Sequence, residues 1–199
     1  MSNDLAGKTF IVTGSNSGIG KVTAERLAQA GYRVFGTSRT LRPSANGVTF
    51  LTLDVTDRES IHQCVDEVIA QAGRIDVLIN NAAVFSTLKM KPFEEIDADE
   101  WDFVMGVNAR GVFNCIKAVS PFMKQQQSGK IINISSSVVV TGRANYAHYV
   151  ASKGAVVALT RALAAIDGFA AGADDVVAKP FHFEVLLARI ARRLTRAAA

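Results

Sequence analysis

Tyr149 and Lys153 have side-chain types and a spacing that could support acid–base chemistry. Residues four positions apart project from the same face of a helix, with their Cβ atoms about 6 Å apart. A free phenol has a pKa of ~10, so proton transfer near pH 7 requires the pKa to fall by ~3 units, or ~4 kcal/mol of preference for the phenolate. A neighbouring ammonium group supplies part of this preference. The pair therefore predicts a tyrosine that exchanges a proton with a substrate, although pairs at this spacing also occur on ordinary helix surfaces.

A glycine-rich turn, TGSNSGIG, covers residues 13–20. Glycine lets the backbone turn tightly and approach a phosphate, and the N-terminus of a following helix offers unpaired N–H groups. A Walker loop is excluded, because Ile19 stands where its second glycine is required and Val22 follows Lys21. The three glycines have the spacing GxxxGxG rather than the GxGxxG of the commoner dinucleotide fingerprint. The turn alone predicts an anion site but does not exclude an ordinary connection between a strand and a helix.

Alternating strand and helix patterns surround these residues, as in βαβ units built on a parallel sheet. Short apolar runs predict strands at 9–13, 33–37, 49–53, 77–79, 130–134 and 176–178. Amphipathic or small-residue patterns predict helices at about 19–30, 56–72, 99–126, 149–166 and 183–196. We therefore expect a single α/β domain over residues 1–199.

Five stretches, in order, resemble the short-chain dehydrogenase/reductase family over about residues 5–165. They are the TGSNSGIG turn, Asp54-Val55, the NNAA at 80–83, Asn108, and INISS at 132–136 followed by YVASK at 149–153. The resemblance implies a doubly wound parallel sheet in a Rossmann-like three-layer sandwich, and a nicotinamide cofactor at the carboxyl edge of the strands. With the last predicted strand added, the sheet has six strands in the order 3-2-1-4-5-6.

The resemblance also implies catalytic roles. Tyr149 would donate a proton to the substrate carbonyl, and Lys153 would hold the nicotinamide ribose and lower the pKa of Tyr149. Ser136, thirteen residues before Tyr149, would hydrogen-bond the carbonyl oxygen, and Asn108 would position a water relay to Lys153. The cofactor would supply the hydride.

Neighbouring residues offer alternatives for two of these roles. Ser135 and Ser137 flank Ser136 and are fallbacks for the serine. Tyr146 is close to Tyr149, but Val150 stands four positions after it, so it lacks the cation.

The end of the second predicted strand favours NADP over NAD. Its sequence, Thr37-Ser38-Arg39, offers no acid to hold the ribose 2′-hydroxyl of NAD, and Arg39 could pair with a 2′-phosphate. The alternative is an ordinary surface arginine. Asp54 would bond the adenine amino group, with the Val55 backbone beside it. The predicted cofactor-binding residues are Gly14, Ser15, Asn16, Ser17, Gly18, Ile19, Gly20, Ser38, Arg39, Asp54, Val55, Asn81, Ala82, Ala83, Tyr149 and Lys153.

Residues 167–196, beginning DGFAAGADDVVAKPF, resemble the end of a response-regulator receiver domain. This second resemblance implies a chimera, with a dehydrogenase-like part over 1–165 and a receiver-like strand and helix over 166–199 that complete the sheet. Receiver phosphorelay needs acids after the first strand, where this chain has Thr13-Gly14-Ser15, so we do not expect it. Because the first family's substrate-covering segment is replaced, we expect cofactor binding with weak or no turnover. The alternative is an active NADP-dependent carbonyl reductase or alcohol dehydrogenase.

The composition of the chain bears on whether it is a membrane, nucleic-acid-binding, disulfide-bonded or metal-binding protein. Hydrophobic residues make up 49% of the chain, without an apolar run near ~20 residues, so we expect a soluble, cytoplasmic protein that neither spans nor binds a membrane. A net charge of +4 is too small to favour nucleic acid as a partner. The two cysteines predict neither a disulfide framework nor a metal site, and the three histidines, His62, His148 and His182, are expected at the surface. The expected partners are the nicotinamide cofactor and a small carbonyl or alcohol, with the oligomeric state left open.

Overall fold

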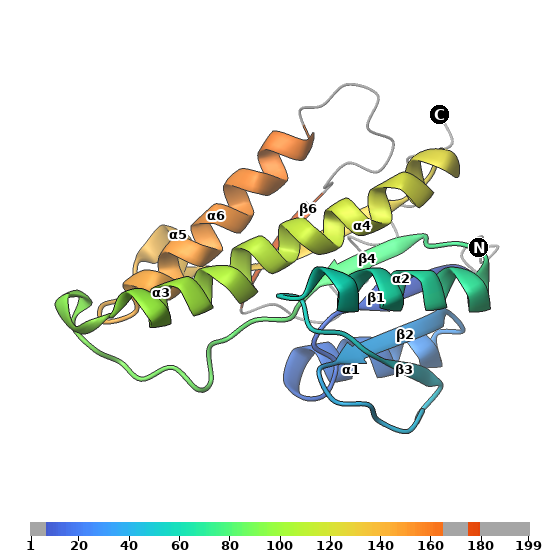
Figure 1. Ribbon diagram of the computed structural model, residues 1–199, viewed down its shortest axis with the longest axis horizontal. Helices are drawn as coiled ribbons and strands as arrows, with labels where there is room; N and C mark the ends of the chain where they lie inside the picture. The colour runs from blue at the N-terminus through green and yellow to red at the C-terminus, as the bar shows by residue number, and fades with distance from the viewer. Residues whose placement is uncertain (1–6, 165–174, 180–199) are drawn as a thin grey trace.

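A parallel sheet with helices packed against it forms the centre of the protein (Figure 1). The computed structural model describes residues 7–164 and 175–179. The strands are β1 (Thr9–Val12), β2 (Arg33–Ser38), β3 (Val48–Thr52), β4 (Val77–Asn80), β5 (Lys130–Ser136) and β6 (Asp175–Lys179). The predicted order 3-2-1-4-5 of the first five strands and the Rossmann-like α/β class are confirmed. All neighbouring pairs are parallel, which places the carboxyl ends of the strands at one edge of the sheet.

β6 lies beside β5, in register from Ile132 opposite Asp175 to Ser136 opposite Lys179. Because β3 and β6 stand at opposite edges of the sheet, Asp54, which follows β3, is separated from Lys179 by the four strands between them. This separation excludes a receiver-type pairing of the two residues. The remainder of the receiver-like segment lies outside the described residues, so the predicted final helix is not tested.

The helices begin and end at residues whose side chains suit those positions. Asp57 caps α2 by accepting a hydrogen bond from the Glu59 N–H at 2.9 Å, and Gly73 ends it in the left-handed region. Asp97 caps α3 by accepting from the Glu100 N–H at 2.8 Å. The helices are α1 (Gly18–Gln29), α2 (Arg58–Ala72), α3 (Ala98–Met105), α4 (Gly111–Gln125), α5 (Val138–Thr141) and α6 (Ala147–Ala164), with a 3-10 turn η1 (Phe93–Glu95) and a π-helical turn η2 (Gly106–Arg110).

The two faces of the sheet carry separate hydrophobic cores. On one face, α1 packs through Ala24 and Leu27 against side chains such as Phe10 and Val34. On the other, α2, α4 and α6 pack over residues such as Ile11 and Leu78. Strands buried on both faces are almost wholly apolar, as the TFIV sequence of β1 illustrates.

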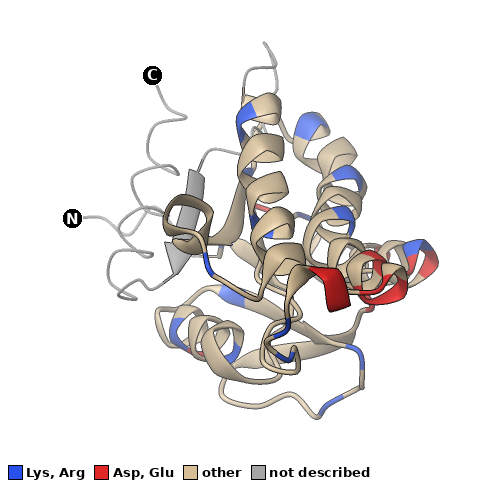
Figure 2. Cartoon of the chain, turned by 90° about the vertical axis from the view of Figure 1, so that its left-hand side faces the viewer, with Lys and Arg blue, Asp and Glu red and all other residues tan. Residues whose placement is uncertain are grey.

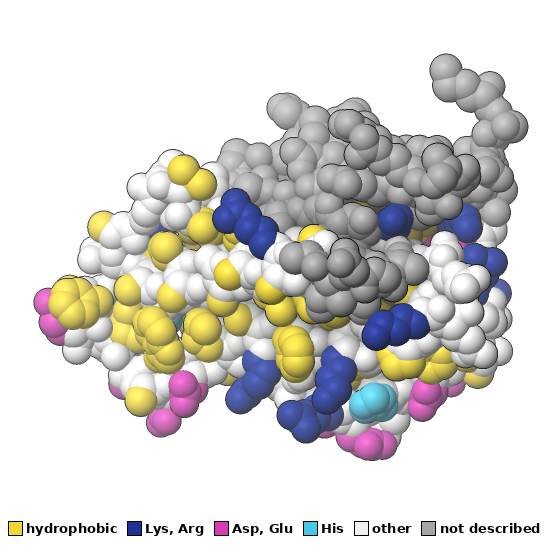
Figure 3. Space-filling view, turned by 90° about the horizontal axis from the view of Figure 1, so that it is seen from above, with side chains coloured by type: hydrophobic (Ala, Val, Ile, Leu, Met, Phe, Trp, Pro, Cys, Tyr) yellow, Lys and Arg dark blue, Asp and Glu magenta, His cyan; other side chains and the backbone are white. Residues whose placement is uncertain are grey.

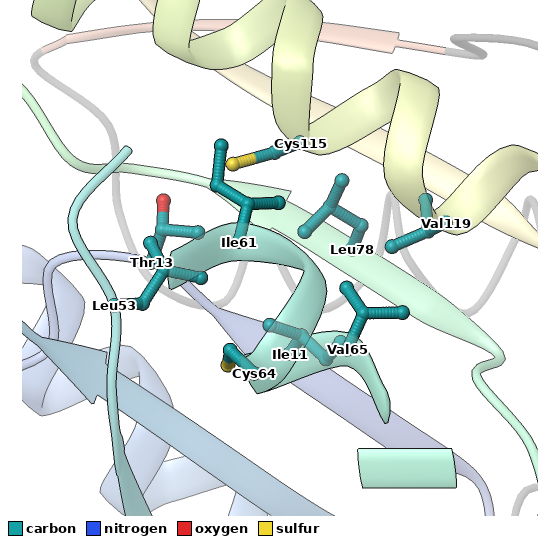
Figure 4. A pocket seen from close by; sticks show the side chains of 9 residues that line it. All are labelled: Ile11, Thr13, Leu53, Ile61, Cys64, Val65, Leu78, Cys115 and Val119. Atoms are coloured by element: carbon teal, nitrogen blue, oxygen red, sulfur yellow. The ribbon is translucent and has the colours of Figure 1, made fainter. Parts of the chain in front are cut away.

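A small cavity lies in the core under α2 and α4 (Figure 4). Its volume is about 10 Å³, close to the minimum for one water molecule. Its lining is almost wholly apolar and includes both cysteines, Cys64 from α2 and Cys115 from α4. A space this small is a packing gap rather than a ligand site.

The segment predicted as one helix over 99–126 is two helices joined by η2. Asn108 lies in this π-helical turn, and its side chain bonds to a neighbouring segment rather than to its own helix. π-Helical turns of this kind commonly occur at functional sites. Sequence periodicity did not reveal the turn, because the apolar pattern on either side of it is that of a helix.

Large apolar side chains remain exposed on α3, α4 and α5. Figure 3 shows hydrophobic side chains gathered over the end of the molecule that α3 and α5 form. The most exposed on these helices are Trp101, Phe103, Phe113 and Val140. Among the described helices, none is both long and apolar enough to cross a membrane.

Candidate active site

The glycine-rich turn after β1 is packed tightly against the segment that follows β4. Gly14 has φ +68°, and a Cβ there would lie 2.8 Å from the Ala82 Cα atom. A Cβ on Gly20 would lie 2.3 Å from both Asn81 Nδ2 and the Gly14 oxygen. Glycine is therefore required at both positions for close approach, and at Gly14 also for its positive φ.

Hydrogen bonds from Asn81 and Ala82 hold this turn in place. Asn81 Nδ2 donates to the oxygens of Thr13 and Gly14, at 3.0 and 3.1 Å. The backbone N–H groups of Asn81 and Ala82 both donate to Thr13 Oγ1 at 3.0 Å. The side chain of Asn81, predicted to bind cofactor, is thus committed to shaping the turn.

The beginning of α1 is open to a ligand. Asn16, Ser17 and Ile19 are exposed, and a Cβ on Gly18 would meet no atom within 4 Å. Ser17 makes no side-chain cap, so its hydroxyl does not occupy the N–H groups of the first helical turn. By contrast, Ser15 is buried and donates to the Val12 oxygen at 2.6 Å. The exposed part of the turn suits an anion, and Ser15 supports it from behind.

The predicted adenosine side of the site lies at the ends of β2 and β3. Arg39 is exposed, whereas Ser38 is buried and donates to the Thr40 oxygen. Asp54 Oδ1 accepts from the N–H and the hydroxyl of Thr56, at 2.8 and 2.7 Å. Asp54 therefore shapes the turn before α2 with one carboxylate oxygen. Val55 beside it is buried, and Ala83 is exposed.

Tyr149 and Lys153 are both buried, with 4% and 1% of their surfaces exposed. Lys153 Nζ donates to the Ile134 oxygen at 2.9 Å and lies 5.9 Å from the centre of the Tyr149 ring. Burial raises the pKa of the Tyr149 phenol, while a hydrogen bond with Ser136 and the charge of Arg143 lower it. The net rise differs from the fall expected from the sequence, because desolvation outweighs both favourable contacts.

Of the three consecutive serines, Ser136 is the one whose hydroxyl lowers the pKa of the Tyr149 phenol, and its Oγ also accepts from the Val138 N–H at 3.4 Å. Ser135 is buried and donates to the backbone oxygen of Lys153 at 3.0 Å, so it holds α6 against β5. Ser137 begins α5 and makes no side-chain cap. The structure thus brings Ser136, Tyr149 and Lys153 together and gives Ser135 a structural role.

Asn108 is buried and joins three segments. Its Oδ1 accepts from the Val84 N–H at 2.7 Å, and its Nδ2 donates to the Val84 oxygen and to Ser152 Oγ, both at 3.1 Å. None of these bonds is with Lys153. Asn108 thus positions the chain after β4 against α6, a role that the sequence did not suggest.

An aromatic cluster absent from the sequence interpretation covers Tyr149. The Phe85 ring centre lies 4.7 Å from that of Tyr149 and 5.7 Å from that of Tyr146. The guanidinium carbon of Arg143 lies 5.0 Å from the centre of the Tyr146 ring. Phe85 and Arg143 were missed because neither has a spacing relation to Tyr149 in the sequence.

The expectation that all three histidines lie at the surface is wrong for His148. Its side chain is fully buried, and Nε2 lies 3.3 Å from Glu100 Oε1. Glu100 also pairs with Lys91, so one carboxylate links the loop before α3 to α6 beside Tyr149. Figure 2 shows acidic residues near the start of α3, where Glu100 lies. His62 is exposed as predicted, and His182 lies outside the described residues.

No group of three or more potential metal ligands occurs within residues 7–164 and 175–179.

A doubly wound parallel sheet, a glycine turn at its carboxyl edge and a buried Tyr–Lys pair together define a Rossmann-like α/β protein. The chain belongs to the short-chain dehydrogenase family, which residues 8–166 match.

Curated relatives agree with this assignment. The chain is 39% identical over 180 residues to a 3-ketodihydrosphingosine reductase of Bacteroides thetaiotaomicron, covering 89% of this chain and 61% of that protein. It is 38% identical over 167 residues to a 3-oxoacyl-(acyl-carrier-protein) reductase of Thermotoga maritima, covering 79% of this chain and 67% of that protein. The chain therefore spans about two thirds or less of the length of these relatives.

The first alignment also bears on the predicted chimera. Because it covers 89% of a 199-residue chain, it extends to at least about residue 177, into the segment that resembles a receiver domain. That segment thus aligns in part with a reductase, and the chimera remains a prediction.

Proposed function

We propose that the chain provides the cofactor site and the proton-transfer groups of an NADP-dependent carbonyl reductase, which could also act as an alcohol dehydrogenase. The observation that carries the proposal is the buried Tyr149, beside the Ser136 hydroxyl and the Lys153 ammonium group. Both relatives are named as reductases of 3-oxo compounds, which favours a carbonyl substrate. When bound, a nicotinamide dinucleotide would supply the hydride.

The residues of the chain would handle the proton. A phenol whose pKa is raised by burial keeps its proton at neutral pH, and the protonated phenol is the form that donates to a carbonyl oxygen. Ser136 would donate a hydrogen bond to the same oxygen. After transfer, the positive charge of Lys153 would stabilise the phenolate of Tyr149. In carbonyl reduction Tyr149 would therefore begin the reaction protonated and act as the general acid.

The cofactor's anionic groups suit the chain at two places. The open N-terminus of α1 offers N–H groups at Gly18, Ile19 and Gly20 for a pyrophosphate. The exposed guanidinium of Arg39 would bind a 2′-phosphate, which is the basis for preferring NADP to NAD. Asp54 and Val55 would lie beside the adenine.

Turnover tests the proposed reaction. Oxidation of NADPH by a panel of 3-oxo compounds is expected, with Tyr149→Phe lowering kcat by at least about 100-fold. Tyr32→Phe, in a half-buried tyrosine at the far end of α1, is the matched control and should retain the wild-type rate. Equal rates in wild type and Tyr149→Phe would contradict the assignment of the proton donor.

A titration of cofactor fluorescence tests the 2′-phosphate assignment. NADPH should bind more tightly than NADH, and Arg39→Ala should remove most of that difference. Arg161→Ala, an exposed arginine on α6, is the control. Tighter binding of NADH to the wild type would overturn the NADP assignment. Weak or absent turnover with normal NADPH binding is the outcome expected from the sequence, and it would indicate a cofactor-binding protein rather than an enzyme.

A further inference from the structure

We propose that Arg143 is an anion-binding residue of the substrate site, so that the preferred substrates are carbonyl compounds carrying a carboxylate or another anionic group. The inference rests on the proposed function and adds a substrate class to it. It follows from three features of the structure: the cation's position, its contact with an aromatic ring, and the absence of a carboxylate partner among the described residues.

Arg143 lies in the connection between α5 and α6, three residues before Tyr146 and six before Tyr149. Tyr146, on whose ring the guanidinium rests, is buried with 8% of its surface exposed. Its ring contacts Phe85, whose ring in turn lies against Tyr149. The charge of Arg143 reaches the Tyr149 phenol, because it lowers the pKa of that group. An anion on Arg143 would therefore lie within electrostatic range of the proton donor, across the contacts of Tyr146 and Phe85.

The orientation of the guanidinium suits binding of an anion. A guanidinium that rests on an aromatic face still presents N–H groups along its edge, and those groups match a carboxylate in a bidentate pair. Because the Tyr146 ring is buried, it forms a firm base for the cation. Arg143 itself is exposed, so a ligand can reach it.

The other cations near Tyr149 are already engaged. Lys153 is buried and donates to the Ile134 oxygen, and Lys91 is paired with Glu100. Arg143, by contrast, has no carboxylate partner within the part of the chain that the structure describes. A cation near the proton donor that meets no carboxylate within residues 7–164 and 175–179 is available to bind an anionic ligand.

Phe85 completes the surface that such a substrate would meet. Its ring is 40% exposed and borders the Tyr149 ring, so it offers an apolar wall beside the phenol. A short oxo acid has complementary parts: a carbonyl for Tyr149, a carbon chain for Phe85 and a carboxylate for Arg143. A neutral ketone of the same length would lack the third contact.

Steady-state kinetics with paired substrates test the proposal. Acetoacetate and levulinate would each be compared with their methyl esters, which keep the ketone and remove the charge. We expect the wild type to prefer the acids in kcat/KM, and Arg143→Gln to lower kcat/KM for the acids by about tenfold or more, mainly through KM. The esters should change less than about twofold, and Arg161→Gln should change neither set.

Arg143→Lys keeps the charge but loses the bidentate geometry, and partial recovery of the preference for acids is expected. Equal losses for acids and esters, with a shifted pH profile, would show that Arg143 acts on Tyr149 instead and would overturn the proposal. An absence of acid preference in the wild type would also overturn it.

Calorimetric titration with the two carboxylates gives a reading that does not depend on turnover. The NADPH complex of the wild type should bind them at least about tenfold more tightly than that of Arg143→Gln. If neither acids nor esters are reduced, the proposed function fails, while this titration still decides whether Arg143 binds carboxylates.

Discussion

Asn108 and Val84 exchange two hydrogen bonds: the Val84 N–H donates to Asn108 Oδ1 at 2.7 Å, and Asn108 Nδ2 donates to the Val84 oxygen at 3.1 Å. The Asn108 side-chain amide thereby satisfies both the N–H and the oxygen of Val84, as the backbone of a neighbouring strand would. The same Nδ2 bonds to Ser152 on α6. Since Phe85 follows Val84 and lies on Tyr149, these bonds determine where the aromatic wall of the site stands.

Replacement of Asn108 should therefore affect both stability and turnover. Asn108→Ala leaves the two Val84 backbone groups without their partner, so we expect the free energy of unfolding to fall by about 2 kcal/mol or more. Urea unfolding measures this change, and kcat/KM should fall with it as Phe85 moves. Asn114→Ala, in another buried asparagine of the same helical segment, should cost less. Similar losses in the two variants would argue against a special role for Asn108.

From the contacts of the Glu100 carboxylate we predict that the stability of the folded protein depends on pH. A hydrogen bond with Lys91 chiefly, and one with His148, hold the pKa of Glu100 below its ordinary value. A group with a depressed pKa in the folded protein stabilises it above the pKa of the unfolded chain, near 4.3, and loses that contribution as the pH falls. Glu100→Gln should thus lower stability at pH 7 by about 1 kcal/mol or less, and the difference from wild type should vanish near pH 3.

Thermal unfolding of both proteins across pH 3–8 measures this effect. Lys91→Met is the companion variant, because it removes the larger cause of the pKa shift and leaves His148 in place. A difference between wild type and Glu100→Gln that persists unchanged at pH 3 would contradict the assignment.

The two cysteines should be inert in the folded protein. Burial raises the pKa of Cys64 and of Cys115 to about 12, so almost no thiolate is present at pH 8. A chromogenic disulfide reagent should therefore react with neither thiol in buffer and with both in denaturant. Rapid reaction of either thiol under native conditions would show that the core between α2 and α4 opens readily.

Gly14 and Gly31 allow backbone strain to be separated from steric clash as causes of destabilisation. Both have positive φ, +68° and +89°, so alanine at either position should lower the free energy of unfolding by about 1 kcal/mol through backbone strain. Only at Gly14 would the new Cβ strike another segment, because no atom lies within 4 Å of a Cβ at Gly31. Gly14→Ala should be the more destabilising by urea unfolding and should weaken NADPH binding, which Gly31→Ala should leave intact.

Much of the fold could be predicted from the sequence because the signals are local. Apolar runs mark buried strands, and Asp57 and Gly73 bound α2. The order of the first five strands was implied by the family resemblance that the motifs carry. The glycine turn and the Tyr149–Lys153 spacing were likewise readable, since both depend on neighbours within a few residues.

The remaining features depend on contacts between distant segments. Asn108 hydrogen-bonds Val84, and His148 is buried against Glu100. Ring contacts connect Arg143 to Tyr149 through Tyr146 and Phe85. Most of these contacts join segments that are far apart in the sequence. The raised pKa of the Tyr149 phenol could not be inferred from the spacing either, because desolvation is a property of the packed core. The sequence by itself therefore determined the order of the elements and the chemical groups of the site. Only the tertiary structure decided which of those groups hold the chain together and which are left to meet a ligand.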